Sequence, residues 1–306
     1  MDGATTRSGS QADDPYVARA RYYSPANIFQ VERRPVPRRN FVDECAWARA
    51  PGTPTGWLTL DISGEIGIDG PATTPLMLAR YATVRPGETL EGNFAASGEF
   101  YYVMSGSGTA AKDVDRLSFE TGDVFSLPGG GTTRLDAGPE GAVLCQFTNE
   151  PEIAFHSVRP PSPGDAPVRA ARYPMADILD ELARARDANR DDPGRSGMAL
   201  HLTTERGGSS DAAHPTIKVA INSLDAGRNQ RPHRHNSVAL TLPIRADRVH
   251  SVIEGERLDW HTHALMITPP AELHEHRNEG DEMMLSLVIQ DGGLYFRCRT
   301  IGFSFD

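Results

Sequence analysis

Two short stretches decide the fold of this chain, PHRHNSVALTLP at residues 232–243 and TPPAELHEHRN at residues 268–278. Seven of the chain's ten histidines lie between His233 and His276. Because side chains two residues apart on a β-strand point to the same face, His233 and His235 are expected to face one way together. A third histidine from a neighbouring strand would complete a site of three imidazole nitrogens. Such a site suits a transition metal such as Fe, Zn, Cu or Ni.

The sequence on either side of the histidines has a β pattern. Residues 57–160 and 198–306 both consist of short apolar segments separated by glycine and proline, as in an antiparallel sandwich or barrel. Both follow the same order of strand, glycine turn, hairpin, short strand into proline and final strands, with 294–303 expected as one of the last strands. We interpret this order as a diverged internal duplication of a β-barrel unit.

The remaining segments are expected to connect or cover the barrels. Residues 1–56 are predicted to form a partly disordered N-terminal arm, in which residues 1–14 are disordered and residues 15–56 pack across a core or a partner subunit. Residues 161–197 are predicted to form a linker with one helix, from Pro174 to about Ala188. Its apolar residues follow the i, i+3, i+4, i+7 spacing of a helix face: Met175, Ile178, Leu179 and Leu182.

Composition excludes several classes of function. The 306-residue chain carries a formal net charge of −10, which argues against binding nucleic acids or anionic membranes. No apolar run approaches the ~20 residues that span a bilayer, and the N-terminus has no apolar core of a secretory signal. The three cysteines form no CxxC pair, which favours reduced thiols and a cytoplasmic location.

The histidine stretches resemble those of the cupins, which are small jelly-roll β-barrels. They are similar above all to bicupins of the gentisate 1,2-dioxygenase and hydroxynaphthoate or salicylate dioxygenase type. The histidine pair of the first cupin motif is His233 and His235, and Pro269 precedes the third ligand, His274, in the second. The resemblance implies an all-β fold of two tandem cupin barrels, with an N-terminal arm and one linker helix.

The two barrels depart from the cupin pattern in different ways. In the first, Asn93 and Ala95 fill the two histidine slots and residues 131–134 contain no histidine, so the metal is expected in the C-terminal barrel. Many cupins add a glutamate four residues after the second histidine; the first barrel has Glu99 there and the second has Ala239. The Gly122-Asp123 turn of the first barrel corresponds to His263-Ala264 in the second.

The substrate side of the site also departs from the family. An arginine that often pairs with the substrate carboxylate is missing from residues 236–241, where Thr241 is the expected substrate contact. His276 is expected just outside the metal ligands, as a catalytic acid or base or a hydrogen-bond donor to substrate, the alternative being a residue of the rim. Trp260 is a candidate for the pocket wall. His250, His261 and His263 are expected on surface hairpins, the alternative for His250 being a place in the pocket wall.

The resemblance, together with the three histidines, implies an Fe(II)-dependent dioxygenase that uses O₂ on a small hydroxylated, aromatic acid. Three neutral imidazoles leave the full charge of the metal and open positions for a bidentate anion and O₂. A non-oxidative enzyme (isomerase, lyase or decarboxylase) using Zn, Ni or Mn is the alternative, and a cupin that binds a small molecule without turnover is a third. A homodimer or homotetramer is expected.

Overall fold

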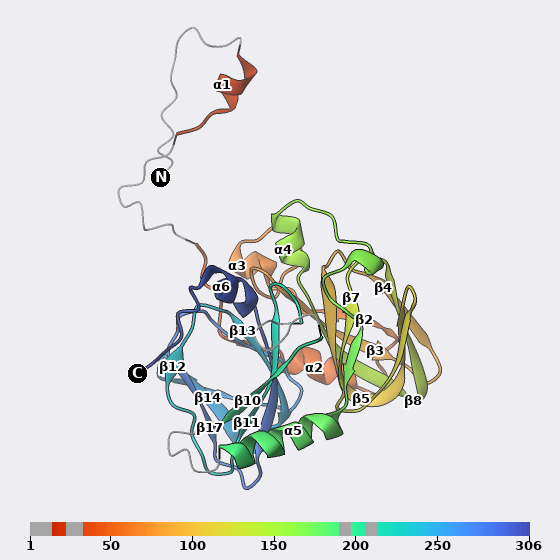
Figure 1. Ribbon diagram of the computed structural model, residues 1–306, viewed down its shortest axis with the longest axis vertical. Helices are drawn as coiled ribbons and strands as arrows, with labels where there is room; N and C mark the ends of the chain where they lie inside the picture. The colour runs from red at the N-terminus through yellow and green to blue at the C-terminus, as the bar shows by residue number, and fades with distance from the viewer. Residues whose placement is uncertain (1–13, 23–32, 190–196, 206–212) are drawn as a thin grey trace. The chain divides into compact units, whose positions relative to one another are not determined.

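The computed structural model describes residues 14–22, 33–189, 197–205 and 213–306 (Figure 1). The chain divides into two compact units, Met1–Arg34 and Pro35–Asp306. The described part of the first unit contains helix α1 (Pro15–Arg19), whose first turn is capped by Asp14, since the Asp14 carboxylate accepts the backbone N–H of Tyr16 at 2.8 Å. The predicted disorder of residues 1–14 concerns positions that lie almost wholly outside the described residues.

The N-terminal barrel of the second unit is built on one eight-stranded antiparallel sheet. Its order is β2-β3-β8-β5-β7-β9, with β4 paired to β8 and β6 paired to β5. The strands are β2 (Gly56–Thr59), β3 (Leu78–Val84), β4 (Thr89–Asn93), β5 (Gly98–Lys112), β6 (Asp115–Glu120), β7 (Val124–Pro128), β8 (Thr132–Thr148) and β9 (Ala171–Tyr173). Because β9 comes from the predicted linker, that segment adds a strand to the first barrel.

The C-terminal barrel has two sheets. The six-stranded sheet, in the order β1-β16-β13-β18-β11-β10, contains β1 (Arg39–Asn40), β10 (Met198–Leu202), β11 (Lys218–Leu224), β13 (Ala239–Arg245), β16 (Met266–Thr268) and β18 (Met284–Gln290). The five-stranded sheet, in the order β15-β14-β17-β12-β19, contains β12 (His233–Arg234), β14 (Val249–Ile253), β15 (Glu256–Asp259), β17 (His274–Asn278) and β19 (Ser304–Phe305). The all-β fold with two tandem barrels is thus confirmed.

The register of the two barrels supports the inferred duplication. In the first barrel, Thr148 of β8 lies opposite Glu99 of β5. In the second, Gln290 of β18 lies opposite Ala239 of β13, in the corresponding place. The turn before the second motif matches as well, because Gly122 and His263 both have positive φ, at 92° and 68°. His263 therefore adopts a backbone conformation for which glycine is the usual residue.

Helices cover the barrels and their connections. They are α2 (Val42–Arg49), α3 (Ser63–Ile66), α4 (Glu150–Phe155), the 3₁₀ turn η1 (Pro163–Asp165), α5 (Met175–Ala188) and α6 (Gly292–Cys298). The expected linker helix is α5, which buries Ile178 and Leu182 and lies along β10 (Figure 1). No helix among the described residues has the length and apolar character needed to cross a membrane.

One expected strand, at 294–303, is wrong: helix α6 occupies 292–298. A side chain at Gly293 would place its Cβ 2.4 Å from the backbone oxygen of Pro215, so only glycine permits this close approach. The strand at the end of the chain is the shorter β19, which pairs with β12 beside the histidines.

The apolar core explains why the six-stranded sheet has two different faces. One face contributes Ile221, Leu240 and Leu287 to a cluster that also contains Tyr81 and Phe147 of the first barrel. This cluster joins the two barrels, and the burial of its side chains stabilises their contact. The other face contributes Leu224, Met266 and Met284 to a smaller cluster with Val249 of the five-stranded sheet and with Trp260, which follows β15. Residues on this second face therefore point toward the sheet that carries the histidines.

The arm also bridges the barrels. Strand β1 pairs with β16 of the C-terminal barrel, and α2 packs against β3 of the N-terminal barrel. The Arg38 guanidinium binds the carboxylates of Glu256 and Glu272 at 2.7 and 2.6 Å. The Tyr81 hydroxyl donates to the His263 carbonyl at 2.8 Å, a further link between barrels. The part of the arm in this unit thus packs across the core. The predicted boundaries between arm, barrels and linker remain predictions.

Candidate metal centre

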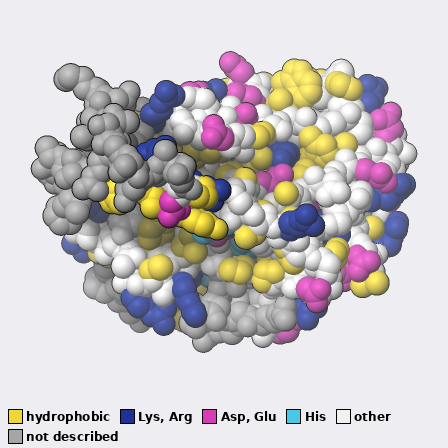
Figure 2. Space-filling view, turned by 90° about the horizontal axis from the view of Figure 1, so that it is seen from above, with side chains coloured by type: hydrophobic (Ala, Val, Ile, Leu, Met, Phe, Trp, Pro, Cys, Tyr) yellow, Lys and Arg dark blue, Asp and Glu magenta, His cyan; other side chains and the backbone are white. Residues whose placement is uncertain are grey.

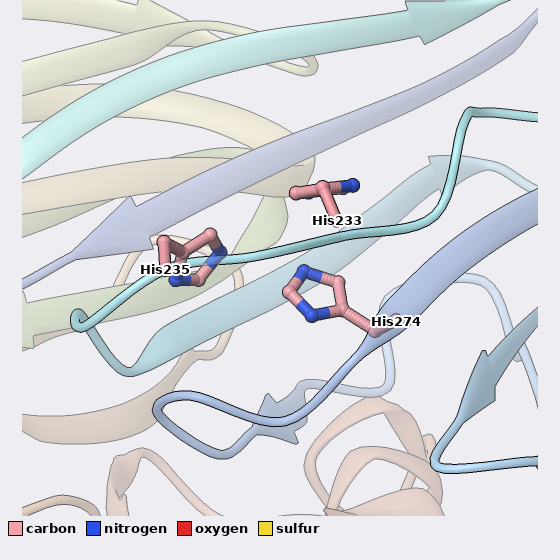
Figure 3. Close-up of side chains that lie close together, drawn as sticks. All are labelled: His233, His235 and His274. Carbon is pink, nitrogen blue, oxygen red and sulfur yellow. The ribbon is translucent and has the colours of Figure 1, made fainter. Parts of the chain in front are cut away.

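Three histidines meet at the edge where β12 and β17 pair. His233 in β12 lies directly opposite His274 in β17, and His235 follows two residues after His233. One ligand nitrogen from each of the three lies within 4.8 Å of the others, and all three residues are buried. Figure 3 shows the three rings lying close together. Among the described residues, this is the one group of three or more potential ligand residues with that geometry.

The backbone determines which nitrogen of each ring faces the centre. In all three rings Nδ1 lies within hydrogen-bond distance of a backbone carbonyl oxygen two residues away: His233 with Arg231 at 3.0 Å, His235 with Ser237 at 2.8 Å, and His274 with Glu272 at 2.9 Å. A carbonyl can only accept, so Nδ1 carries the proton and Nε2 keeps its lone pair. This outer hydrogen bond fixes each ring so that Nε2 is the atom that could bind a metal ion.

Burial keeps these imidazoles neutral. It lowers the pKa of His235 to about 4 and that of His274 to about 2, with the neighbouring histidines adding to the effect. Burial also lowers the pKa of His233. Near neutral pH all three rings are therefore unprotonated at Nε2, which is the form that binds a metal ion. The donor set fits a divalent transition metal.

His276 is held by a chain of two further side chains. It follows two residues after His274 on β17, and the two ring centroids are 5.9 Å apart. Its Nδ1 lies 2.9 Å from the Ser251 hydroxyl, which accepts the indole N–H of Trp260 at 2.8 Å. Because the indole can only donate, it directs the Ser251 proton toward Nδ1 of His276. The proton of His276 then resides on Nε2, and burial lowers the pKa of this ring to about 3.

The other candidate residues differ in how deeply they are buried. Thr241 is buried on the inward face of β13, opposite Val288 of β18. Trp260 is buried and acts on His276 through Ser251. The expected surface position of His250 is wrong, because β14 buries it to 2% exposure. His263 is also half-buried, with its ring 5.8 Å from that of Tyr102, whereas His261 is exposed as expected.

Two residues near the centre carried no signal in the sequence, Ser251 and Gln290. Ser251 lies opposite His276 in the β14–β17 pair, and Gln290 Nε2 lies 3.3 Å from Nε2 of His235. Their importance depends on which strands pair and in which register. A serine and a glutamine in apolar strands have no local motif that would identify them.

The surface near the centre is partly aromatic. Phe303 and Phe305, about half exposed, have ring centroids 5.3 and 6.3 Å from that of His233. In Figure 2 histidine side chains are visible in a recess bordered by hydrophobic side chains. An aromatic border of this kind suits an approach route for a flat organic molecule.

Comparison with known proteins gives partial matches in sequence. No family model matches the chain. The 5-aminosalicylate 1,2-dioxygenase of a Comamonas species is 30% identical over 106 residues, which cover 34% of this chain and 28% of that protein. The gentisate 1,2-dioxygenase of a Haloferax species is 32% identical over 85 residues, covering 28% of this chain and 24% of that protein. The chain thus matches about a quarter of the length of these relatives.

The match in three dimensions extends over nearly the whole chain. The salicylate 1,2-dioxygenase of Pseudoaminobacter salicylatoxidans superposes with a TM-score of 0.74 at 15% identity, covering 91% of this chain and 90% of that one. The oxalate decarboxylase of Bacillus subtilis superposes with a TM-score of 0.54 at 15% identity, covering 82% and 76%. The fold is that of the bicupin salicylate 1,2-dioxygenase, and the predicted resemblance to bicupins of the gentisate 1,2-dioxygenase type is confirmed.

Proposed function

We propose that this protein is an Fe(II)-dependent dioxygenase that opens the ring of a small hydroxylated aromatic acid. The observation that supports the proposal most is the set of three buried Nε2 lone pairs on His233, His235 and His274, with Ala239 where many cupins have a ligand carboxylate. When bound there, Fe(II) supplies the sites at which an ortho-hydroxy acid and O₂ can meet. The relatives named 1,2-dioxygenases favour this chemistry.

The protein's own residues then bind and orient the substrate. The three neutral imidazoles hold the metal without cancelling its charge, so an anionic substrate is favoured over a neutral one. The Nε2–H of His276, fixed by Ser251, is available to donate to an oxygen atom of the substrate. Because its pKa is lowered to about 3, His276 acts as a hydrogen-bond donor and stays uncharged at neutral pH.

A non-oxidative metal enzyme is the second candidate function. Two observations favour it: β13 carries no inward arginine near the centre, and the oxalate decarboxylase shares the fold. In that case Zn, Ni or Mn would polarise a bound carbonyl or enolate. A binding protein without turnover is the third candidate.

Oxygen consumption distinguishes these functions. Protein reconstituted with Fe(II) without air is mixed with salicylate, gentisate or 5-aminosalicylate, and O₂ uptake and aromatic absorbance are recorded. We expect equimolar loss of O₂ and of one of these acids, and neither loss with the His274→Ala variant. Loss of an acid without O₂ uptake would favour the non-oxidative enzyme. Binding of metal and acid without any turnover would favour the binding protein.

We also propose that the protein is a homodimer or homotetramer. Trp47 on α2 is 46% exposed. Exposed aromatic side chains of this size are typical of protein interfaces. Light scattering should give a mass of two or four subunits, and a monomeric mass would contradict the proposal.

A further inference from the structure

A polar side chain of the neighbouring strand β18 lies beside the position where many cupins have a ligand carboxylate. Ala239 occupies the slot where many cupins have a glutamate, and its methyl group is too short to reach the centre. Gln290 of β18 lies directly opposite Ala239 of β13. Paired residues of an antiparallel sheet project on the same face, so Gln290 points toward the histidine sheet as Ala239 does.

The Gln290 amide reaches the metal-binding atom of His235. Its Nε2 lies 3.3 Å from Nε2 of His235. Because Nδ1 of His235 carries the ring proton, that Nε2 has a lone pair, and the amide N–H donates to it. A metal ion on His235 would take this lone pair. The amide N–H would then lie at the border of the centre and require another acceptor.

Gln290 belongs to a row of cross-strand neighbours whose side chains suit an anion. Lys218 of β11 is the other neighbour of Gln290, and its Nζ lies 3.5 Å from the ring centroid of Phe296. On the far side of Ala239 lies Thr268 of β16. Among the described residues, the buried Thr268 hydroxyl has no hydrogen-bond partner. The row thus contains an amide, an ammonium and a hydroxyl, and no carboxylate.

We propose that Gln290 is a substrate-positioning residue whose amide N–H donates to the carboxylate of an ortho-hydroxy acid held at the metal centre. The assignment rests on the proposed function and supplies the carboxylate contact for which β13 offers no arginine. Donation by the amide is favoured over ligation through its oxygen, because neutral carbonyl oxygens suit Mg²⁺ and Ca²⁺ better than the metals that imidazole prefers. Lys218 adds positive charge on the same face.

Binding measured without O₂ tests the assignment. Salicylate and catechol both offer two oxygen atoms to a metal, but catechol lacks the carboxylate. For the Fe(II)-loaded Gln290→Leu variant, we expect the Kd of salicylate to rise about 10- to 100-fold, because one hydrogen bond to a charged group is lost. The Kd of catechol should change less than about twofold, a difference within RT. Metal content should equal that of the wild type.

A second variant keeps the size and shape of the side chain. Gln290→Glu places a negative charge beside the substrate carboxylate, so salicylate binding should weaken more than in Gln290→Leu. Equal salicylate binding by wild type and Gln290→Leu would overturn the role assigned to Gln290 and leave the proposed function intact. Metal loss in Gln290→Leu would also overturn it, since Gln290 would then hold the metal. Failure of the wild type to bind any of salicylate, gentisate and 5-aminosalicylate would overturn the proposed function together with the assignment.

Discussion

Replacing Lys112 with methionine should lower the free energy of unfolding by about 3–5 kcal/mol, the cost of leaving one member of a buried ion pair alone. Lys112 and Glu99 form a salt bridge in the N-terminal barrel, and both side chains are fully buried. Burial raises the pKa of Glu99, and the Lys112 ammonium opposes this rise. Without Lys112, the buried Glu99 carboxyl must either stay charged with no cation beside it or take up a proton. Urea unfolding at pH 7 measures the loss.

The hydrogen bonds around Glu99 suggest a matched control. Its carboxylate also accepts from Tyr101, from Thr133 at 2.9 Å and from Gln146 at 3.4 Å. The double variant Lys112→Met/Glu99→Gln keeps an acceptor for these donors without a buried charge, so it should regain most of the lost stability. A double variant no more stable than Lys112→Met would contradict this account of the pair.

A surface variant provides the baseline. Arg116 is exposed, and its guanidinium lies 3.8 Å from the partly exposed carboxylate of Asp136. Replacing Arg116 with methionine should change the unfolding free energy by about 0–1 kcal/mol. The contrast between Arg116→Met and Lys112→Met therefore separates the effect of burial from the effect of losing a cation. In the barrel that lacks the three histidines, the Lys112 ammonium thus neutralises the buried Glu99 carboxylate.

Replacing His276 with asparagine should lower kcat about 10²- to 10³-fold, the loss typical of removing one hydrogen-bond donor to the reacting group, while the metal content stays unchanged. The ring is adjacent to the centre, and its Nε2–H is the donor that the proposed function uses. Steady-state O₂ uptake with the preferred acid measures kcat, and elemental analysis of the same sample measures the metal. Loss of metal in this variant would show that His276 is a ligand, and full activity would show that it is a residue of the rim.

The Ser251 hydroxyl should affect activity by holding His276 in one tautomer. Ser251→Ala removes the group that fixes the proton on Nε2, so the ring can adopt the other tautomer. We expect a smaller loss of activity than for His276→Asn, about 10- to 100-fold, as is typical of outer hydrogen-bond partners. In the double variant with His276→Asn, removal of Ser251 should cause no further loss. An additional loss would mean that Ser251 acts independently of His276.

The parts of the fold that follow from local sequence were predictable. Strand alternation placed His233 and His235 on one face, and the cupin spacing identified His274 as their partner; the structure brings the three together. The linker helix followed from the spacing of Ile178 and Leu182, which are the residues that α5 buries. Such patterns depend on neighbours a few residues apart, so the sequence alone contains them.

The parts that depend on strand register were not predictable. The Gln290–His235 contact joins residues 55 positions apart, and the Glu99–Lys112 bridge is set by how β5 folds against the barrel interior. The α6 segment has apolar residues that suit a strand as well as a helix, and its conformation is decided by the close approach of Gly293 to Pro215. Tertiary contact outweighs local preference at such positions.

The metal content of protein purified without air tests the central claim most directly. Elemental analysis should give about one metal ion per subunit for the wild type and for His261→Ala, an exposed control, since one barrel carries the three histidines. The His233→Ala/His235→Ala and His274→Ala variants should retain almost none. An unchanged metal content in these variants, or a wild type that takes up no metal on reconstitution, would contradict the assignment of this centre.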